Sequence, residues 1–444
     1  SQWSQIGQNI NGRQGGGQSG SSVSLSDNGN IVAIGAIAAN TNPNGNGSAS
    51  PSYSGYVRVF ENINGSWSQI GNDILGENSH DNSGCSVSIS SDGNIVAIGA
   101  PNNYGNAGIG TGHVRIYNYN GSQWVQLAQD LNGDQNNDAF GYSVSLSNNG
   151  NTVAIGAHGN DGGGSNSGRV RIYENISGTW SQIGQDIDGQ AADDNSGYSV
   201  SLSSDGNIVA IGAPGYYTGS YGYTRIYEYN GSNWNQLGQD LIGESIYDYS
   251  GYCVSLSSDG NRVSIGAPEN NGGGINSGHV RVLEYNGSAW NQLGQDINGE
   301  ATVDRSGESV SMSNDGNTVA IGAHGNDGNG LGWGSGHARI YNWDGSSWTQ
   351  LGFDLDGDAY GDYFGASVSL SANGNTVAIG APNPPNMPVT SGTGFVRVYN
   401  INIPCPSGCT DPLALNYDPV AVMDDSSCCY DCGKIEGFIY EDAD

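Results

Sequence analysis

The sequence predicts an all-β fold: a seven-bladed β-propeller built from four-stranded antiparallel blades. The segment Val-Ala-Ile-Gly-Ala recurs seven times, with its valine at positions 32, 96, 153, 209, 263 (as Val-Ser-Ile-Gly-Ala), 319 and 377. Asp-Gly and Asn-Gly dipeptides, which favour tight hairpins, separate the strand-like runs. Gly supplies 74 of 444 residues and charged residues only 12%, a composition that suits strands and turns better than long helices.

Each repeat contains the same four runs in the same order. The first is Gly-x-Ser-Val-Ser-Leu-Ser, as at 197–203, and the second is Val-Ala-Ile-Gly-Ala. The third is Gly-x-Val-Arg-Ile-Tyr, as at 168–173, and the fourth is Trp-x-Gln-Ile/Leu-Gly, as at 180–184. Four antiparallel strands at this period are typical of a propeller blade.

The two ends of the repeat array predict a closed ring rather than an open solenoid. A tryptophan run occurs at Trp3, before the first complete repeat, and the last repeat reaches Phe395–Tyr399 without a tryptophan run of its own. We therefore expect residues near Trp3 to supply the outer strand of the seventh blade. Closure removes the exposed strand edges of an open array.

The alternating strand directions predict two different faces. The first-to-second and third-to-fourth turns share one face and are short and uniform. The second-to-third loops and the blade-to-blade connections share the other face, where the loops vary in length and the connections are acidic. Variable loops are where recognition is usually located.

The net charge of −31 narrows the range of partners. It argues against a nucleic acid or an anionic membrane surface, since both require a basic face. No apolar run reaches about 18 residues, so no membrane span is expected. Clustered cysteines near the C-terminus predict disulfides and an oxidising compartment; they are Cys405, Cys409, Cys428, Cys429 and Cys432.

The repeat resembles the FG-GAP repeat of integrin α-subunit propellers, and more closely the FG-GAP-like propellers of secreted and cell-surface proteins of aquatic microbes. The resemblance rests on the first three runs and covers roughly residues 1–400. Integrin-type repeats carry an Asp-x-Asp-x-Asp-Gly calcium loop, whereas the turns here, such as 204–207, hold too few carboxylates for a calcium cage. We therefore do not expect calcium in the blades.

The C-terminal residues resemble two further motifs. Residues 408–428 resemble a Cys-flanked acidic module of large secreted proteins, and residues 437–444 resemble the opening of an SdrD B-like repeat. We predict a propeller at 1–403, a Cys-rich acidic module at 404–432 and the start of a further β domain at 433–444. Calcium in the acidic module is the one candidate cofactor, a solvated acidic turn being the alternative; its candidate ligands are Asp411, Asp418, Asp424 and Asp425.

Two sets of charged residues recur at equivalent positions, which argues against a single catalytic centre. A buried guanidinium is costly without a partner, so we interpret the sets as Arg–Asp pairs that tie strands or blades together. The arginines of the third run are Arg58, Arg115, Arg171, Arg225, Arg281, Arg339 and Arg397. The aspartates that precede the first run are Asp81, Asp138, Asp194, Asp248, Asp304 and Asp362.

Asn-x-Ser sequons predict N-glycosylation, but Asn-Gly is also a favoured hairpin turn, so both interpretations stay open. The candidates are Asn46, Asn64, Asn120, Asn175, Asn230 and Asn286.

The repeated aromatic and histidine positions also need an interpretation as packing or as binding residues. The seven repeated tryptophans are interpreted as packing anchors, with sugar stacking as the alternative, whereas Trp333 in a second-to-third loop is the candidate ligand contact. His113, His279 and His337 share a repeat position that other blades fill with Tyr, Arg or Phe. That exchange indicates a surface position and argues against a metal site.

No nucleophile elbow, Walker loop, dinucleotide fingerprint or HExxH motif occurs, and no carboxylate pair stands apart as glycosidase chemistry requires. We therefore predict a secreted or cell-surface, non-enzymatic propeller that serves as an extracellular adhesion or structural module. Its partner would be an extracellular protein or glycan, and self-assembly into a surface fibre is a further hypothesis. The alternatives are a carbohydrate-binding head that uses the variable face and a propeller hydrolase.

Overall fold

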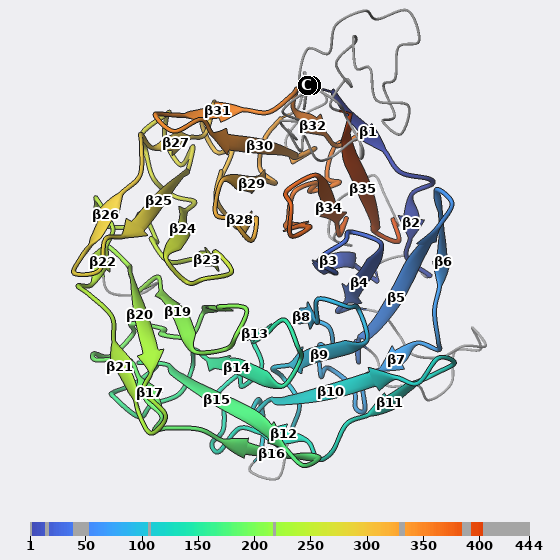
Figure 1. Cartoon of the computed structure of the whole chain (residues 1–444), viewed down its shortest axis with the longest axis vertical. Helices are drawn as coiled ribbons and strands as arrows, with labels where there is room; N and C mark the ends of the chain where they lie inside the picture. The colour runs from blue at the N-terminus through green and yellow to red at the C-terminus, as the bar shows by residue number, and fades with distance from the viewer. Residues whose placement is uncertain are drawn as a thin grey trace, which may run out of the picture.

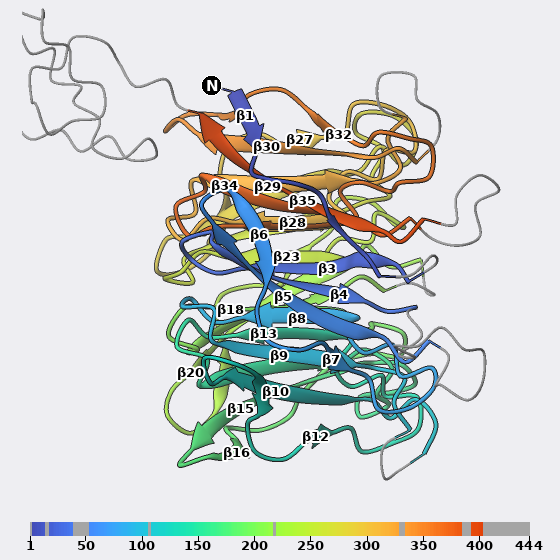
Figure 2. The same ribbon diagram turned by 90° about the vertical axis from the view of Figure 1, so that its right-hand side faces the viewer.

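The computed structural model describes residues 2–13, 17–38, 53–104, 108–215, 219–327, 334–383 and 392–402. They form seven antiparallel sheets arranged as a ring around a central axis (Figure 1). Figure 2 shows this ring from its edge. The predicted all-β, seven-bladed propeller is confirmed. Within these ranges no helix is long and apolar enough to cross a membrane.

The first strand of each blade lies nearest the axis and the fourth lies at the rim. The first strands of blades 1 to 7 are β3 (Ser19–Leu25), β8 (Ser86–Ile89), β13 (Ser143–Leu146), β18 (Ser199–Leu202), β23 (Cys253–Leu256), β28 (Ser309–Met312) and β33 (Ser367–Leu370). The second strands are β4 (Ile31–Ala36), β9 (Ile95–Ala100), β14 (Thr152–Ala157), β19 (Ile208–Ala213), β24 (Arg262–Ala267), β29 (Thr318–Ala323) and β34 (Thr376–Ala381). The third strands are β5 (Tyr56–Ile63), β10 (His113–Tyr119), β15 (Arg169–Ile176), β20 (Tyr223–Tyr229), β25 (His279–Tyr285), β30 (His337–Trp343) and β35 (Phe395–Asn402). The fourth strands are β6 (Ser66–Gln69), β11 (Trp124–Gln126), β16 (Thr179–Gln182), β21 (Trp234–Gln236), β26 (Trp290–Gln292), β31 (Trp348–Gln350) and, for blade 7, β1 (Gln2–Gln5).

Each blade also has a two-residue strand that the sequence did not predict. It continues the fourth strand along the rim and pairs with the first two residues of the third strand. These strands are β7 (Ile74–Leu75), β12 (Leu131–Asn132), β17 (Ile187–Asp188), β22 (Leu241–Ile242), β27 (Ile297–Asn298), β32 (Leu355–Asp356) and β2 (Ile10–Asn11). In blade 1 the break between the two pieces falls at Gly71, which has φ of 67°. A Cβ on Gly71 would lie 2.6 Å from Cδ1 of the Trp124 indole in the next blade, so a side chain there requires the indole to shift. Blade 2 has Ala128, with φ of 65°, at the equivalent position.

The ring closes as predicted. Strand β1 pairs antiparallel with β35, from Gln2 opposite Asn402 to Gln5 opposite Tyr399. Strand β2 then pairs with the first two residues of β35. The seventh blade therefore combines the two ends of the described chain.

The hydrophobic core lies between blades rather than within one. Val32 and Ile34 of β4 pack in a cluster with residues of blade 7, whereas Ala33 joins a cluster with residues of blade 2. The second strand thus turns large side chains to one neighbour and small ones to the other. A Cβ on Gly35 would lie 2.1 Å from the carbonyl oxygen of Gly84 in blade 2, so the glycine of Val-Ala-Ile-Gly-Ala is what permits the close contact between blades.

The serines of Gly-x-Ser-Val-Ser-Leu-Ser have three separate roles, as blade 2 illustrates. Ser86 Oγ donates to the carbonyl of Gly141 in blade 3 (2.9 Å). Ser88 Oγ accepts the backbone N–H of Leu146 in blade 3 (2.9 Å). Ser90 Oγ accepts the N–H of Ile95 (2.9 Å) and closes the turn to the second strand. Two serines therefore join neighbouring blades, and the third shapes a hairpin.

The first-to-second turns form a closed circle of backbone hydrogen bonds at one end of the central axis. Asp27 N–H donates to the carbonyl of Ser91 (3.0 Å), and the circle ends where Ala372 N–H donates to the carbonyl of Asp27 (2.9 Å). The donors in order are Asp27, Ser91, Asn148, Ser204, Ser258, Asn314 and Ala372. We call this end, with the third-to-fourth hairpins, the turn face, and the opposite end the loop face.

Candidate functional site

Comparing the seven repeats with one another separates residues that the fold needs from residues that it does not. Residues that recur in the blades pack or form hydrogen bonds between blades, as Gly35 and Ser88 do. The residue just after the glycine that opens each first run varies between blades, although its backbone position is equivalent. It lies where each first strand begins, on the loop face beside the central axis; the seven residues are Ser21, Cys85, Tyr142, Tyr198, Tyr252, Glu308 and Ala366.

Blades 3 to 6 turn this position into a continuous arc. The Tyr142 hydroxyl lies 2.8 Å from the Tyr198 hydroxyl, and the two rings are 4.8 Å apart between centroids. Tyr198 and Tyr252 are 4.9 Å apart, and the Tyr252 hydroxyl donates to Oε1 of Glu308 (3.4 Å). We call these four residues the tyrosine arc.

Two histidines from the second-to-third loops contact the arc. The ring of His158 lies 4.3 Å from that of Tyr142 and 5.5 Å from that of Tyr198, and burial lowers the pKa of His158 to about 4. His324 Nδ1 lies 2.5 Å from Oε2 of Glu308. The arc therefore combines aromatic rings, hydroxyls and a carboxylate with one neutral imidazole and one imidazole in contact with an acid.

A second set of variable residues lies three positions before the arc residues. Each has a left-handed backbone with φ between 54° and 58°, which strains a residue other than glycine. Arg305, one of this set, forms an ion pair of 3.1 Å with Glu269, a carboxyl whose pKa is raised by burial. The set comprises Gln18, Asn82, Ala139, Asn195, Tyr249, Arg305 and Tyr363. The same strained backbone thus presents five different kinds of side chain at seven equivalent positions on the loop face.

Six of the seven repeated arginines join consecutive blades, whereas Arg225 pairs with Asp240 of its own blade. In blade 2, Arg115 donates to the backbone carbonyl of Leu75 in the preceding blade (2.7 Å). Arg58, Arg281 and Arg339 make the equivalent bond to Asn11, Ile242 and Asn298. The other three pair with acidic residues near the rim: Arg171 with Asp134 and Asp186, Arg225 with Asp240, and Arg397 with Asp358.

The repeated aspartates fasten the blade connections instead. Asp81 Oδ2 accepts the backbone N–H groups of Glu77 and Asn78 (3.1 and 2.7 Å) and the side-chain amide of Asn103 (3.0 Å). The other five repeated aspartates accept hydrogen bonds from the equivalent backbone N–H groups; they are Asp138, Asp194, Asp248, Asp304 and Asp362. Among the residues that the structure describes, no ion pair joins the two sets, so the predicted partners were wrong.

The repeated tryptophans also join blades. Each indole N–H donates to a carbonyl on the rim of the preceding blade, as from Trp67 to Ile6 (2.9 Å) and from Trp3 to Leu351 (2.6 Å). Trp3 and Trp67 are only 2% and 5% exposed. These contacts favour the packing interpretation over sugar stacking.

The shared histidine position is not at the surface, contrary to the sequence-based prediction. His113, His279 and His337 are only 1–2% exposed. Each lies between a glutamate of the preceding blade connection and an aspartate of its own blade, with one ligand atom from each of the three residues within 4.8 Å of the others. We call these groups the rim clusters: Glu77–His113–Asp130, Glu244–His279–Asp296 and Glu300–His337–Asp354. A cavity of about 530 Å³ opens beside the first.

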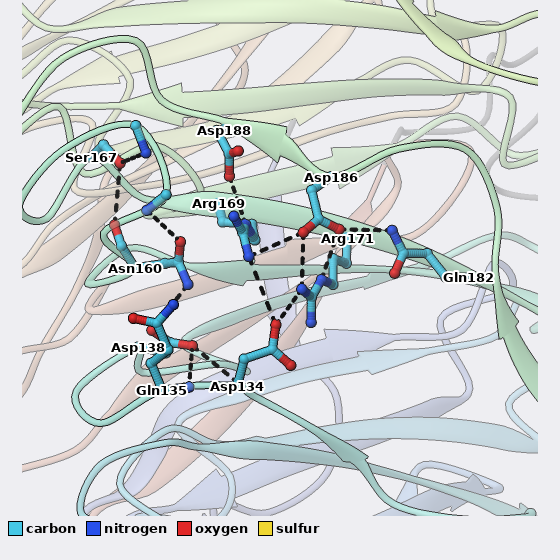
Figure 3. Close-up of polar contacts among 12 residues, drawn as sticks. Asp134, Gln135, Asp138, Asn160, Ser167, Arg169, Arg171, Gln182, Asp186 and Asp188 are labelled. Carbon is cyan, nitrogen blue, oxygen red and sulfur yellow. Dashed lines mark hydrogen bonds and ion pairs between the residues drawn. The ribbon is translucent and has the colours of Figure 1, made fainter. Parts of the chain in front are cut away.

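Blade 3 has an arginine at the same position, as Figure 3 shows. Arg169 Nη1 lies 3.0 Å from Asp186 and 3.7 Å from Asp134, and its Nε donates to Asp188 (2.6 Å). Asp134 and Asp186 occupy the repeat positions of Glu77 and Asp130. A cation therefore lies between the corresponding pair of acids.

Five of the six asparagines predicted as glycosylation sites lie at the third-to-fourth hairpins of the turn face: Asn64, Asn120, Asn175, Asn230 and Asn286. The side-chain oxygens of Asn120, Asn230 and Asn286 accept backbone N–H groups of their own turns, and Asp344 does the same in blade 6. This gives the repeated residue a role in the turn, and glycosylation stays a prediction.

Some predicted residues lie outside the described ranges: Asn46, Trp333, the four aspartates 411, 418, 424 and 425, the five C-terminal cysteines, and the boundary after residue 403. Cys85 and Cys253, which are described, are free thiols. Burial raises their pKa values to about 12 and about 11.

Two of the comparisons with known proteins, a family model and a solved structure, agree with this architecture. Residues 128–173, which run from blade 2 into blade 3, match the FG-GAP repeat family. A segment of 29 residues is 66% identical to ribulose bisphosphate carboxylase/oxygenase activase 1, chloroplastic, of Larrea tridentata, and 62% identical to the corresponding activase of Oryza sativa subsp. japonica. Each match covers 6% of this chain and 6% of the relative. A chain of Kuenenia stuttgartiensis hydrazine synthase superposes with a TM-score of 0.52 at 11% identity, over 83% of this chain and 94% of that one. This likeness concerns the fold.

Proposed function

We propose that this propeller is an extracellular, non-enzymatic adhesion module that binds its ligand on the loop face, at the tyrosine arc. The observation that carries the proposal is the contrast between the two ends of the same first strands. At the turn face their turns form one uniform circle of backbone bonds. At the loop face they begin with residues that differ from blade to blade and gather aromatic and polar groups in blades 3 to 6.

The chemistry of the arc suits an uncharged polar ligand. Tyrosines combine a large apolar ring with a hydroxyl and lose little conformational entropy on binding. The match to the FG-GAP repeat supports the extracellular part of the proposal, because this repeat is the one that the sequence relates to secreted and cell-surface propellers.

A carbohydrate is one candidate partner, and the row of tyrosine rings supports it. Adjacent rings 4.8–4.9 Å apart with hydroxyls in contact can pack against the apolar face of a sugar while hydrogen bonding to its hydroxyls. An extracellular protein segment would use the same rings as anchors.

A binding experiment with arc variants tests both candidates. Tyr142, Tyr198 and Tyr252 would be changed together to Ser, the residue that blade 1 carries at this position as Ser21. Wild-type and variant proteins would be applied to a glycan array and to surfaces coated with extracellular-matrix proteins. We expect the wild type to bind a subset of one of these panels and the variant to lose at least tenfold in apparent affinity.

A rim variant is the matched control. Val125→Ser alters an exposed residue of β11 (48% exposed) far from the arc and should bind as the wild type does. Equal binding by the triple variant and the wild type would contradict the assignment of the site. Turnover of a bound glycan or peptide would contradict the non-enzymatic part.

A further inference from the structure

The rim clusters are not explained by adhesion at the tyrosine arc. We propose that each rim cluster is a binding site for a divalent transition-metal ion such as Zn²⁺, held by the buried histidine and the two flanking carboxylates. The sites would join consecutive blades, because the glutamate comes from one blade's connection and the histidine and aspartate from the next. This inference is independent of the proposed function.

In one rim cluster the histidine brings an unsatisfied nitrogen to the acids. His279 is 1% exposed, and its Nδ1 has no hydrogen-bond partner among the described residues although it lies 4.0 Å from Oε2 of Glu244. In His113 and His337 it is Nε2 that lacks a partner in the described part of the chain. Buried polar atoms almost always have a partner, so the Nδ1 of His279, which faces a carboxylate without a bond to it, indicates a missing ligand. In His113 and His337 the nitrogen that faces the acid is also Nδ1, at 3.9 and 4.0 Å.

Neighbouring side chains hold one oxygen of five of the six acids and leave the other for the cluster. Gln350 donates to Oδ1 of Asp354 (2.6 Å), whose Oδ2 lies 4.0 Å from Nδ1 of His337. Arg115 binds Oε1 of Glu77 (3.3 Å), whose Oε2 lies 3.9 Å from Nδ1 of His113. Second contacts of this kind orient the ligands in metal sites.

Blade 3 shows that the position accepts a positive charge. There the guanidinium of Arg169 lies between Asp134 and Asp186 (Figure 3). Where arginine is replaced by a shorter, uncharged histidine, the two acids remain and the cation is lost. A metal ion bound to the histidine would restore the same charge arrangement.

The repeats also vary together at these positions. Histidine occurs in three blades, and in all three the residue after the connection's glycine is glutamate, which no other blade has there. The seven combinations are Arg13 with Tyr56, Glu77 with His113, Asp134 with Arg169, Gln190 with Tyr223, Glu244 with His279, Glu300 with His337, and Asp358 with Phe395. A joint function of the glutamate and the histidine accounts for this pairing.

The donor set selects the class of ion. One imidazole nitrogen with two carboxylates suits Zn²⁺ and similar ions, whereas Ca²⁺ and Mg²⁺ prefer all-oxygen sites. The glutamates are 43–48% exposed on their side chains, so they are free to close around an ion. Three protein ligands leave the fourth position to water.

Metal counting on the full chain tests the proposal. All thiols would first be alkylated, so that cysteine cannot bind the ion, and bound Zn²⁺ would be measured by equilibrium dialysis. Co²⁺ substitution would give a visible absorption spectrum that reports the coordination geometry. We expect three equivalents for the wild type, two for His279→Phe and none for the triple variant His113→Phe, His279→Phe, His337→Phe. Phenylalanine is already tolerated at this position in blade 7.

Three further variants make the test sharper. Arg169→His should raise the count to four, and Glu244→Gln should lower it to two without removing a histidine. Tyr223→Phe, at the same position of a blade without the glutamate, should leave it at three. Unchanged binding by the triple variant, no binding by the wild type at saturating Zn²⁺, or a count of three in Arg169→His would each overturn the proposal.

Discussion

The backbone N–H of Leu25 donates a hydrogen bond of 2.9 Å to Oγ of Ser369, which lies 344 residues further along the chain. The same bond joins the other neighbouring first strands, as between Leu202 and Ser145 (3.0 Å). The junction between the last and first blades is therefore made of the same contacts as every other junction in the ring.

We expect Ser369→Ala to destabilise the protein by about 1–3 kcal/mol, because it leaves the partly buried N–H of Leu25 without an acceptor. Ser145→Ala, which breaks the equivalent bond within the continuous part of the chain, should cost a similar amount. Urea unfolding followed by tryptophan fluorescence measures both. A cost for Ser145→Ala but none for Ser369→Ala would show that the closing junction is looser than the others.

We expect Trp3→Ala to cost about 3–5 kcal/mol, the usual loss when a large buried aromatic side chain is removed. Trp3 is 2% exposed, packs between blades 6 and 7, and donates its indole N–H to Leu351. The control is Val125→Ala at an exposed site, which should change the free energy of unfolding by less than about 0.5 kcal/mol. Thermal unfolding monitored by circular dichroism would compare the two variants. Equal unfolding midpoints for Trp3→Ala and Val125→Ala would contradict the assigned role of Trp3.

Gly322→Ala should be among the most destabilising single substitutions in the ring. Its Cβ would lie 1.9 Å from the carbonyl oxygen of Gly365 in the next blade, and backbone on both sides has nowhere to move. We expect a loss of about 3 kcal/mol or more. Gly345→Ala is the matched control: nothing lies within 4 Å of its added Cβ, and only its φ of 95° opposes the change, at roughly 1–2 kcal/mol. Urea unfolding would measure the loss of unfolding free energy in both variants. Similar losses would argue against a tight contact between Gly322 and the next blade.

Because of His158, the folded protein should become less stable as the pH is lowered from 6.5 toward 4. Burial holds its pKa at about 4 in the folded protein against 6.5 for the free group, so the folded state favours the neutral imidazole. Above pH 6.5 neither state binds the proton; as the pH falls from 6.5 toward 4, the unfolded chain binds it and the folded protein does not, so the folded state loses relative stability. His158→Phe should lose less stability than the wild type between pH 7 and pH 4.5. Tyr142→Phe, which removes a hydroxyl from the same contact without a group that titrates in this range, should follow the wild type. Parallel pH dependences of all three would contradict the prediction.

The repeat pattern was sufficient to predict the blades, their strand order and the closure through Trp3, because each depends on residues that recur in every copy. The two-residue strands at the rim were missed. Their sequences, such as Ile-Leu at β7, are too short for any periodicity, and only the pairing with β5 reveals them.

The tyrosine arc was missed for the opposite reason. The first run varies at one position, which holds Tyr142, Tyr198, Tyr252 and Glu308 in blades 3 to 6. The fold was predicted from the residues that the repeats share, and that comparison leaves out a position at which they differ. The partners of four of the seven repeated arginines were out of reach because they are backbone carbonyls, such as that of Leu75, which leave no trace in the side-chain sequence. The burial of His113 depends on packing between blades that no local pattern encodes.

The pairing of Gln2 with Asn402 has a mechanical consequence. In the antiparallel pair of β1 and β35 these two residues lie at the same end. Tension applied between them in opposite directions would act on one hydrogen bond at a time, each contributing only about 1 kcal/mol, so the pair would unzip rather than shear. The ring would open at this seam under a small force, while blades 1 to 6, whose strands each come from one continuous stretch, would keep their sheets intact.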